Sequence, residues 1–138
     1  MAQVTIEEIR ASETWALRQR VMWPERPLKD SILPDDEKGI HYGMRLEGEL
    51  VSVISLFWQG TEIQFRKFAT AQEMQGKGYG SRLLQHCLTQ ARTLGATALW
   101  CNARKEKIAF YQRFALRETG ECFKRNGRAY VIMRCELQ

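Results

Sequence analysis

The chain has 138 residues, of which 44% are hydrophobic and 27% charged, and its formal net charge is +5. A chain of this length buries about two thirds of its unfolded surface, enough for one core, so we expect a single domain over residues 1–138. No apolar run is long enough to cross a bilayer and the chain start carries no signal-peptide pattern, which argues against a membrane protein and predicts a soluble, cytoplasmic one.

The first third of the chain predicts an edge strand, a helix and a long loop. Residues 4–9 alternate apolar and charged side chains, as an edge strand does. A helix is expected to begin at Ser12, whose hydroxyl can cap its first turn, and to end before Pro24. The polar stretch up to Gly39 predicts a loop, and we expect Arg18 and the other scattered arginines to face solvent.

Three strands are expected in the middle of the chain. Residues 41–46 and 50–57 form a hairpin, and residues 61–69 follow a turn at Gly60. In the third strand Lys67 would share a face with Ile63 and Phe65. The opposite face is polar, which is unusual for a central strand and predicts that it lines a cleft; it carries Glu62, Gln64, Arg66 and Phe68.

The second half of the chain predicts a helix, a strand, a short helix and a hairpin. Apolar side chains recur at helical spacing after a glycine-rich turn, with Gly95 as a left-handed cap. A strand at residues 96–101 and a short helix at residues 107–114 follow. The final hairpin turns at Asn126 and Gly127. The buried face of the long helix would carry Leu83, Leu84, Cys87, Leu88, Ala91 and Leu94.

Cysteine usage predicts free thiols. The four cysteines, at positions 87, 101, 122 and 135, show no C-x-x-C pairing, and the chain has two histidines, so we expect no metal site. Cys87 lies on the apolar helix stripe and Cys101 in a strand, positions that favour a packing role over a catalytic thiol.

The glycine-rich turn at residues 75–80, QGKGYG, leads directly into the long helix, where backbone N–H groups can hold a phosphate. Three common phosphate motifs do not fit. A Walker A loop needs Ser or Thr where Gly78 stands and glycine where Ala71 stands, and a dinucleotide fingerprint needs glycine at Ser81. No catalytic or metal-binding aspartate motif of a kinase follows.

The pattern Gln75-x-x-Gly78-x-Gly80 resembles the acetyl-CoA-binding motif of the GNAT superfamily of N-acetyltransferases. The resemblance extends over about residues 50–135, since Asn102 ends a strand-like run and Tyr111 stands where the family often has a tyrosine acid. It implies a mixed α+β fold with a twisted, mostly antiparallel sheet and helices on both faces. The sheet would splay at the parallel strand pair that flanks the loop.

The resemblance also implies a reaction. An acetyl group would pass from acetyl-CoA, a co-substrate used without a metal, to a primary amine of a small molecule, peptide or protein by direct attack in a ternary complex. Tyr111 would act as the acid and either Glu62 or Glu73 as the base. Three residues would border the acceptor: Trp23, Gln64 and Arg66.

The loop amides would hold the diphosphate of acetyl-CoA, while Gln75 adds a side-chain donor and Lys77 a positive charge. The backbone of residues 68–70 would pair with the pantetheine arm as a missing strand would. The residues expected at acetyl-CoA are Phe68, Ala69, Thr70, Gln75, Gly76, Lys77, Gly78, Tyr79, Gly80, Ser81, Asn102 and Lys107.

The chain departs from the family pattern at three positions. Gln72 replaces a common proline, Tyr79 an aliphatic residue and Ala115 a common glycine. Two other classes stay open: a catalytically silent acyl-CoA-binding or regulatory domain, and a nucleic-acid-binding module, which the positive charge favours but the lack of a recognised motif disfavours. Neither the acceptor amine nor the oligomeric state follows from these residues, and a homodimer stays open.

Overall fold

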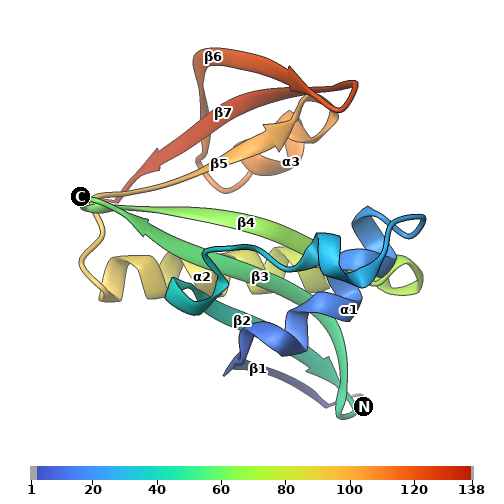
Figure 1. The fold of residues 1–138 in the computed structure, drawn as a ribbon. Helices are drawn as coiled ribbons and strands as arrows, with labels where there is room; N and C mark the ends of the chain where they lie inside the picture. Colours follow the sequence, from blue (N-terminus) through green and yellow to red (C-terminus); the bar gives the residue numbers. More distant parts are fainter. Residues whose placement is uncertain (1–2, 138) are drawn as a thin grey trace. The chain divides into compact units, whose positions relative to one another are not determined.

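The computed structural model of the chain describes residues 3–137, which form both strands and helices (Figure 1). The strands are β1 Val4–Ile9, β2 Ile40–Leu46, β3 Glu49–Gln59, β4 Glu62–Thr70, β5 Ala98–Arg104, β6 Arg117–Arg125 and β7 Arg128–Glu136. The α-helices are α1 Ala11–Met22, α2 Tyr79–Thr93 and α3 Ile108–Gln112. Short 3-10 turns lie at η1 Leu28–Ser31, η2 Asp36–Lys38, η3 Gln72–Met74 and η4 Lys105–Lys107.

The strands form a seven-stranded sheet in the order β1-β2-β3-β4-β5-β7-β6. β1 with β2, β2 with β3, β5 with β7 and β6 with β7 pair in antiparallel fashion. β4 and β5 run parallel, with Ile63 opposite Leu99 and Gln64 opposite Trp100. The predicted α+β class with a mostly antiparallel sheet is confirmed, and β1 lies at an edge as expected.

The chain forms two compact units. The first unit comprises the chain up to Phe57 together with Lys67–Cys87, and the second comprises Trp58–Arg66 together with the chain from Leu88 onward. β4 and α2 therefore contribute residues to both units. The single domain expected from the length stays a prediction.

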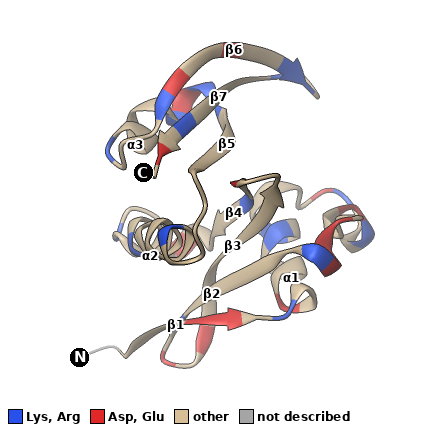
Figure 2. Ribbon diagram, turned by 90° about the vertical axis from the view of Figure 1, so that its left-hand side faces the viewer, with Lys and Arg blue, Asp and Glu red and all other residues tan. Residues whose placement is uncertain are grey.

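In the first unit, α1 and the beginning of α2 lie on opposite sides of β2 and β3 (Figure 2). Leu17 of α1 packs with Ile9 and Val53 in a hydrophobic cluster. On the other side, the His86 ring of α2 stands edge-on to Tyr42, with 4.9 Å between the ring centroids. Successive strand residues point to opposite faces, so each face of the strands meets its own helix.

In the second unit, β5, β7 and β6 form a three-stranded antiparallel arrangement. Neighbouring residues of β5 and β7 contribute buried side chains on one face of these strands, with Leu99 beside Cys135 and Cys101 beside Met133. The hairpin turn takes positive φ at Asn126 and Gly127, 52° and 75°. This is the tight turn predicted from the Asn-Gly pair, and the prediction is confirmed.

The start of α1 differs from the prediction. The helix begins at Ala11, and the backbone N–H of Arg10 donates to the Glu13 carboxylate at 2.8 Å. Glu13 therefore supplies the partner that a capping box places three residues into a helix. The cap predicted at Ser12 is wrong, because Ser12 already lies inside the first turn.

Two further packing predictions are wrong. Lys67 takes a φ of 54° within β4, so the regular alternation expected for Ile63, Phe65 and Lys67 breaks there. Leu94 is 43% exposed, because α2 ends at Thr93. The cap at Gly95 is confirmed by its φ of 86°.

Candidate active site

The glycine-rich loop lies in the first unit, between β4 and α2. Gly76 and Gly78 take φ values of 77° and 86°, in the left-handed region that glycine adopts at little cost. An added Cβ at either position would meet open space, so these glycines serve the backbone conformation and not close packing. Since α2 begins at Tyr79, its first N–H groups, which lack partners within the helix, lie at the end of the loop.

The end of β4 lies close against the start of α2. An added Cβ at Gly80 would lie 3.2 Å from Thr70 Oγ1 and 3.3 Å from Phe68 Cζ. Glycine at this position therefore allows the strand and the helix terminus to approach. The Thr70 hydroxyl is held from β3, with 2.8 Å between Thr70 Oγ1 and Ser52 Oγ. The structure thus brings Phe68, Thr70 and Gly80 together.

The other expected acetyl-CoA residues of this unit differ in their surroundings. Gln75 Nε2 donates a hydrogen bond to the Thr70 carbonyl at 2.9 Å, so one of its amide N–H groups is engaged within the protein. Ala69 is buried in the cluster with Leu17, and its carbonyl accepts a hydrogen bond from Ser52 Oγ at 3.3 Å. Lys77 is exposed at the surface of the loop.

Tyr111, the expected acid, lies on α3 in the second unit. Its ring centroid is 5.7 Å from that of Phe65 and 5.2 Å from that of Phe110. Burial raises the pKa of the Tyr111 phenol, and the nearby Cys101 thiol adds to this effect. The phenol therefore keeps its proton at physiological pH and can donate it.

The two carboxylates expected as bases have different environments. Glu62 accepts a hydrogen bond from Arg134, with 2.6 Å between Oε1 and Nη1, and this bond lowers the pKa of Glu62. A general base works best with a pKa near the operating pH, so this ion pair disfavours Glu62 in that role. Glu73 is exposed in the η3 turn.

The residues expected at the acceptor are placed as follows. Gln64 is 7% exposed and accepts a hydrogen bond from Gln59 Nε2 at 3.2 Å, so its side chain is engaged within the second unit. Arg66 is half-buried. In the first unit Trp23 follows the end of α1, and the Arg26 guanidinium lies 5.0 Å from the centroid of its ring.

Asn102 and Lys107 belong to the second unit. Asn102 stands opposite Ile132 in the β5–β7 ladder and is half-buried. Because β5 continues to Arg104, the prediction that Asn102 ends its strand is wrong. Lys107 is exposed at the end of the η4 turn.

A buried ion pair of the first unit was missed at the sequence level. Arg18 is 1% exposed and donates to both carboxylate oxygens of Asp36, at 2.9 and 3.0 Å. Burial alone would raise the pKa of Asp36, but the hydrogen bonds from Arg18 and the Leu33 amide outweigh it and hold that pKa below its usual value. The expectation of a solvent-facing Arg18 is wrong. Helical spacing could have indicated that Arg18 is buried, because it lies one turn after Thr14, which is buried as well.

The ion pair belongs to a polar network that fastens the segment after α1. Arg18 also donates to the Ser31 carbonyl and to Ser55 Oγ, both at 2.9 Å. His41 Nδ1 lies 2.7 Å from Ser55 Oγ, and His41 Nε2 lies 2.9 Å from the Asp36 carbonyl. The network therefore joins α1, the segment around η1 and η2, β2 and β3.

Cys87 and Cys101 agree with the packing role expected of them, while Cys122 is exposed. All four cysteines are free, and Cys87 and Cys101 are buried. Burial raises the pKa of both thiols, which makes them poor nucleophiles. Among residues 3–137, no three His, Cys, Asp or Glu side chains gather where they could hold a metal ion. None of the described helices combines the length and the apolar character needed to cross a membrane.

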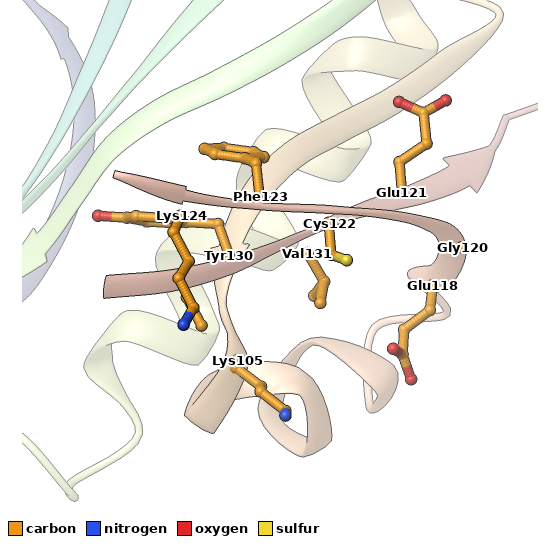
Figure 3. Close-up of a pocket in the computed structure, with 10 residues that line it drawn as sticks. Lys105, Glu118, Gly120, Glu121, Cys122, Phe123, Lys124, Tyr130 and Val131 are labelled. Atoms are coloured by element: carbon orange, nitrogen blue, oxygen red, sulfur yellow. The ribbon is translucent and has the colours of Figure 1, made fainter. Parts of the chain in front are cut away.

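A pocket of about 370 Å³ lies in the second unit beside the irregular part of β6 (Figure 3). Cys122, Val131 and Glu118 point to the side on which Lys105 lies, and Phe123 points to the other side. The lining carries charges of both signs and includes none of the residues expected for catalysis or acetyl-CoA.

Comparison with known proteins identifies the family. Residues 6–115 match the acetyltransferase (GNAT) family. The uncharacterized N-acetyltransferase YitI of Bacillus subtilis is 26% identical over 127 residues, which cover 86% of this chain and 85% of that protein.

Solved structures share the fold. An IAA acetyltransferase from Bacillus cereus superposes with a TM-score of 0.82 at 23% identity. The superposition covers 98% of this chain and 100% of the Bacillus cereus chain. A GNAT family acetyltransferase from Elizabethkingia anophelis with acetyl-CoA bound gives a TM-score of 0.77 at 20% identity. The superposition covers 97% of this chain and 98% of the Elizabethkingia anophelis chain. The chain therefore belongs to the acetyltransferase (GNAT) family, and its assignment as an N-acetyltransferase is confirmed.

Proposed function

We propose that the chain transfers the acetyl group of acetyl-CoA to a primary amine of a small molecule, peptide or protein. The amine nitrogen attacks the thioester carbonyl in a ternary complex, so that a C–N bond forms, the C–S bond breaks and the thiolate leaves. The observation that carries this proposal is the glycine-rich loop at the start of α2, packed against the end of β4. Family membership and the acetyl-CoA-bound relative from Elizabethkingia anophelis support it.

In this proposal the loop holds the diphosphate. The left-handed conformations of Gly76 and Gly78 are compatible with backbone N–H groups turned toward an anion, and the start of α2 adds its unpaired N–H groups. A negative charge at a helix N-terminus gains about 0.3–1 kcal/mol. Lys77 supplies a positive charge beside it. Phe68, Ala69 and Thr70 meet the pantetheine arm through their backbone.

Tyr111 is the proposed acid for the leaving thiolate. The phenol is protonated over the working pH range, and the rings of Phe65 and Phe110 hold its orientation. Burial raises its pKa, which makes the phenol a weaker acid than an exposed tyrosine, so the proposal rests on its position in the family motif and not on the pKa. General acids contribute about 100- to 10,000-fold to a rate. We infer that Glu73 is the better candidate base, because Glu62 is engaged by Arg134.

The acceptor side is proposed to include Trp23, Gln64 and Arg66. The buried network around Arg18 and Asp36 holds the chain that follows Trp23. The cytoplasmic location stays a prediction, which the four free cysteines support, because thiols persist in a reducing compartment. The homodimer stays a prediction as well.

Two measurements test the proposal. Calorimetric titration is expected to show binding of acetyl-CoA and much weaker binding of adenosine, which lacks the diphosphate. A panel of amines, assayed by release of the coenzyme A thiol, is then expected to reveal at least one acceptor. Binding without turnover on any amine would indicate a silent acyl-CoA-binding domain, and absence of binding would contradict the proposal altogether.

A further inference from the structure

We propose that Gln75 is a positioning residue that fastens the glycine-rich loop to the end of β4 before any ligand binds. The sequence alone suggests a different role, in which the side chain of Gln75 donates to the phosphates. In the structure its Nε2 donates to the Thr70 carbonyl at 2.9 Å.

The loop needs such an attachment because it has little packing of its own. Gln75, Gly76, Lys77 and Gly78 are exposed, and the space beside both glycines is open. The two glycines also give the backbone more freedom than other residues would. A hydrogen bond at the start of this segment therefore removes much of its motion.

Thr70 lies beside both ends of the segment and is bonded to the first. Its carbonyl accepts the hydrogen bond from Gln75, and a Cβ added to Gly80 would lie 3.2 Å from its hydroxyl. Thr70 is itself bonded to Ser52 of β3, with 2.8 Å between the two hydroxyl oxygens, and Ser52 is fully buried. The Gln75 contact thus joins the start of the segment to a strand residue that the core holds in place.

The consequence for acetyl-CoA, which rests on the proposed function, is that the amides are positioned in advance. The net free energy of one ordinary hydrogen bond corresponds to about a 2- to 12-fold change in an equilibrium constant. Without the Gln75 contact, the loop has to become ordered when acetyl-CoA binds, and this ordering costs free energy. The affinity for acetyl-CoA is therefore expected to fall by this factor. The turnover number at saturating acetyl-CoA is expected to change little.

The test compares Gln75→Ala with Gln72→Ala. Both variants remove the same uncharged side chain from the exposed loop region, but no hydrogen bond of the Gln72 side chain occurs among the described residues. Backbone nitrogen-15 order parameters of the ligand-free protein are measured over residues 76–80. We expect them to fall into the flexible range, below about 0.6, in Gln75→Ala and to keep their wild-type values in Gln72→Ala.

Wild-type order parameters in Gln75→Ala, or an equal decrease in both variants, would overturn the proposal. This readout needs no acetyl-CoA. A protein that does not bind acetyl-CoA would defeat the proposed function, while the order parameters would still decide the role of Gln75. If Gln75 instead contacts the phosphates alone, its replacement weakens binding and leaves the order parameters of the ligand-free protein unchanged.

Discussion

Replacing Gly78 by alanine is expected to weaken acetyl-CoA binding about 5- to 30-fold. Gly78 has a φ of 86°, and an added Cβ would meet open space, so the substitution causes no clash in the free protein. The effect arises from the backbone, because a left-handed conformation costs a residue with a Cβ about 1–2 kcal/mol. Since 1.4 kcal/mol is about a tenfold change in affinity, this cost corresponds to the stated range.

The cost should appear in binding and not in stability. Gly78 lies in an exposed loop, so an alanine there can leave the left-handed conformation by displacing the amides that the Gln75 contact positions, and the strain returns when these amides must hold a ligand. Gly127→Ala is a matched control, since Gly127 has a φ of 75° and open space beside it. That turn closes a hairpin ladder, so there the substitution should cost about 1–2 kcal/mol of stability and leave acetyl-CoA affinity unchanged.

Calorimetric titration of the three proteins with acetyl-CoA, together with their urea unfolding curves, checks this prediction. If Gly78→Ala binds acetyl-CoA as tightly as the wild type while remaining folded, the amides of the loop do not hold the ligand. Equal weakening in both variants would show that the effect is not specific to the loop.

Three more perturbations have definite expected outcomes. Asp36→Asn leaves Arg18 buried without its countercharge and should cost about 3–5 kcal/mol in urea unfolding. The folded-state pKa of Asp36 is lowered, so its carboxylate stabilises the folded wild type above the unfolded pKa of about 3.9, and this stability is lost as pH falls further. The free energy of unfolding of Asp36→Asn should lack this loss below about pH 3.9. The same loss in wild type and variant would contradict the role given to the Asp36 carboxylate. Tyr111→Phe should lower the turnover number about 100-fold or more with little change in acetyl-CoA affinity, and a wild-type turnover number would remove Tyr111 from the mechanism. Ala115→Gly should stabilise the protein by about 0.5–1 kcal/mol, because Ala115 is exposed and has a φ of 66°; a lower thermal midpoint would refute this.

The features of the fold that depend on neighbouring residues could be predicted from the sequence. The Asn126–Gly127 turn, the cap at Gly95 and the stripe from Leu83 to Ala91 each depend on neighbouring residues, and each is found in the structure. The motif Gln75-x-x-Gly78-x-Gly80, together with Asn102 and Tyr111 downstream, was also enough to indicate the family.

Interactions between distant residues were not predictable in the same way. Arg18 lies on a helix face with buried neighbours, but its partner Asp36 follows eighteen residues later in a segment that reads as a polar loop. A buried arginine is uncommon unless it is paired, so composition favoured solvent exposure. Arg134 likewise meets Glu62 from a strand far along the chain, and this partner changes what Glu62 can do.

The positive φ of Lys67 is a second feature that the sequence could not predict. A positive φ at lysine is unfavourable, so nothing in the local sequence indicates it. The face pattern predicted for β4 fails at that residue. Ala115 is different, because the family often has a glycine there, and its φ of 66° shows why glycine would suit that position.

A crystal structure with bound coenzyme A tests the central claim most directly. The account predicts diphosphate oxygens within about 2.7–3.2 Å of backbone nitrogens in residues 76–81, at the start of α2. Diphosphate bound elsewhere on the protein, or loop N–H groups directed away from it, would contradict the account.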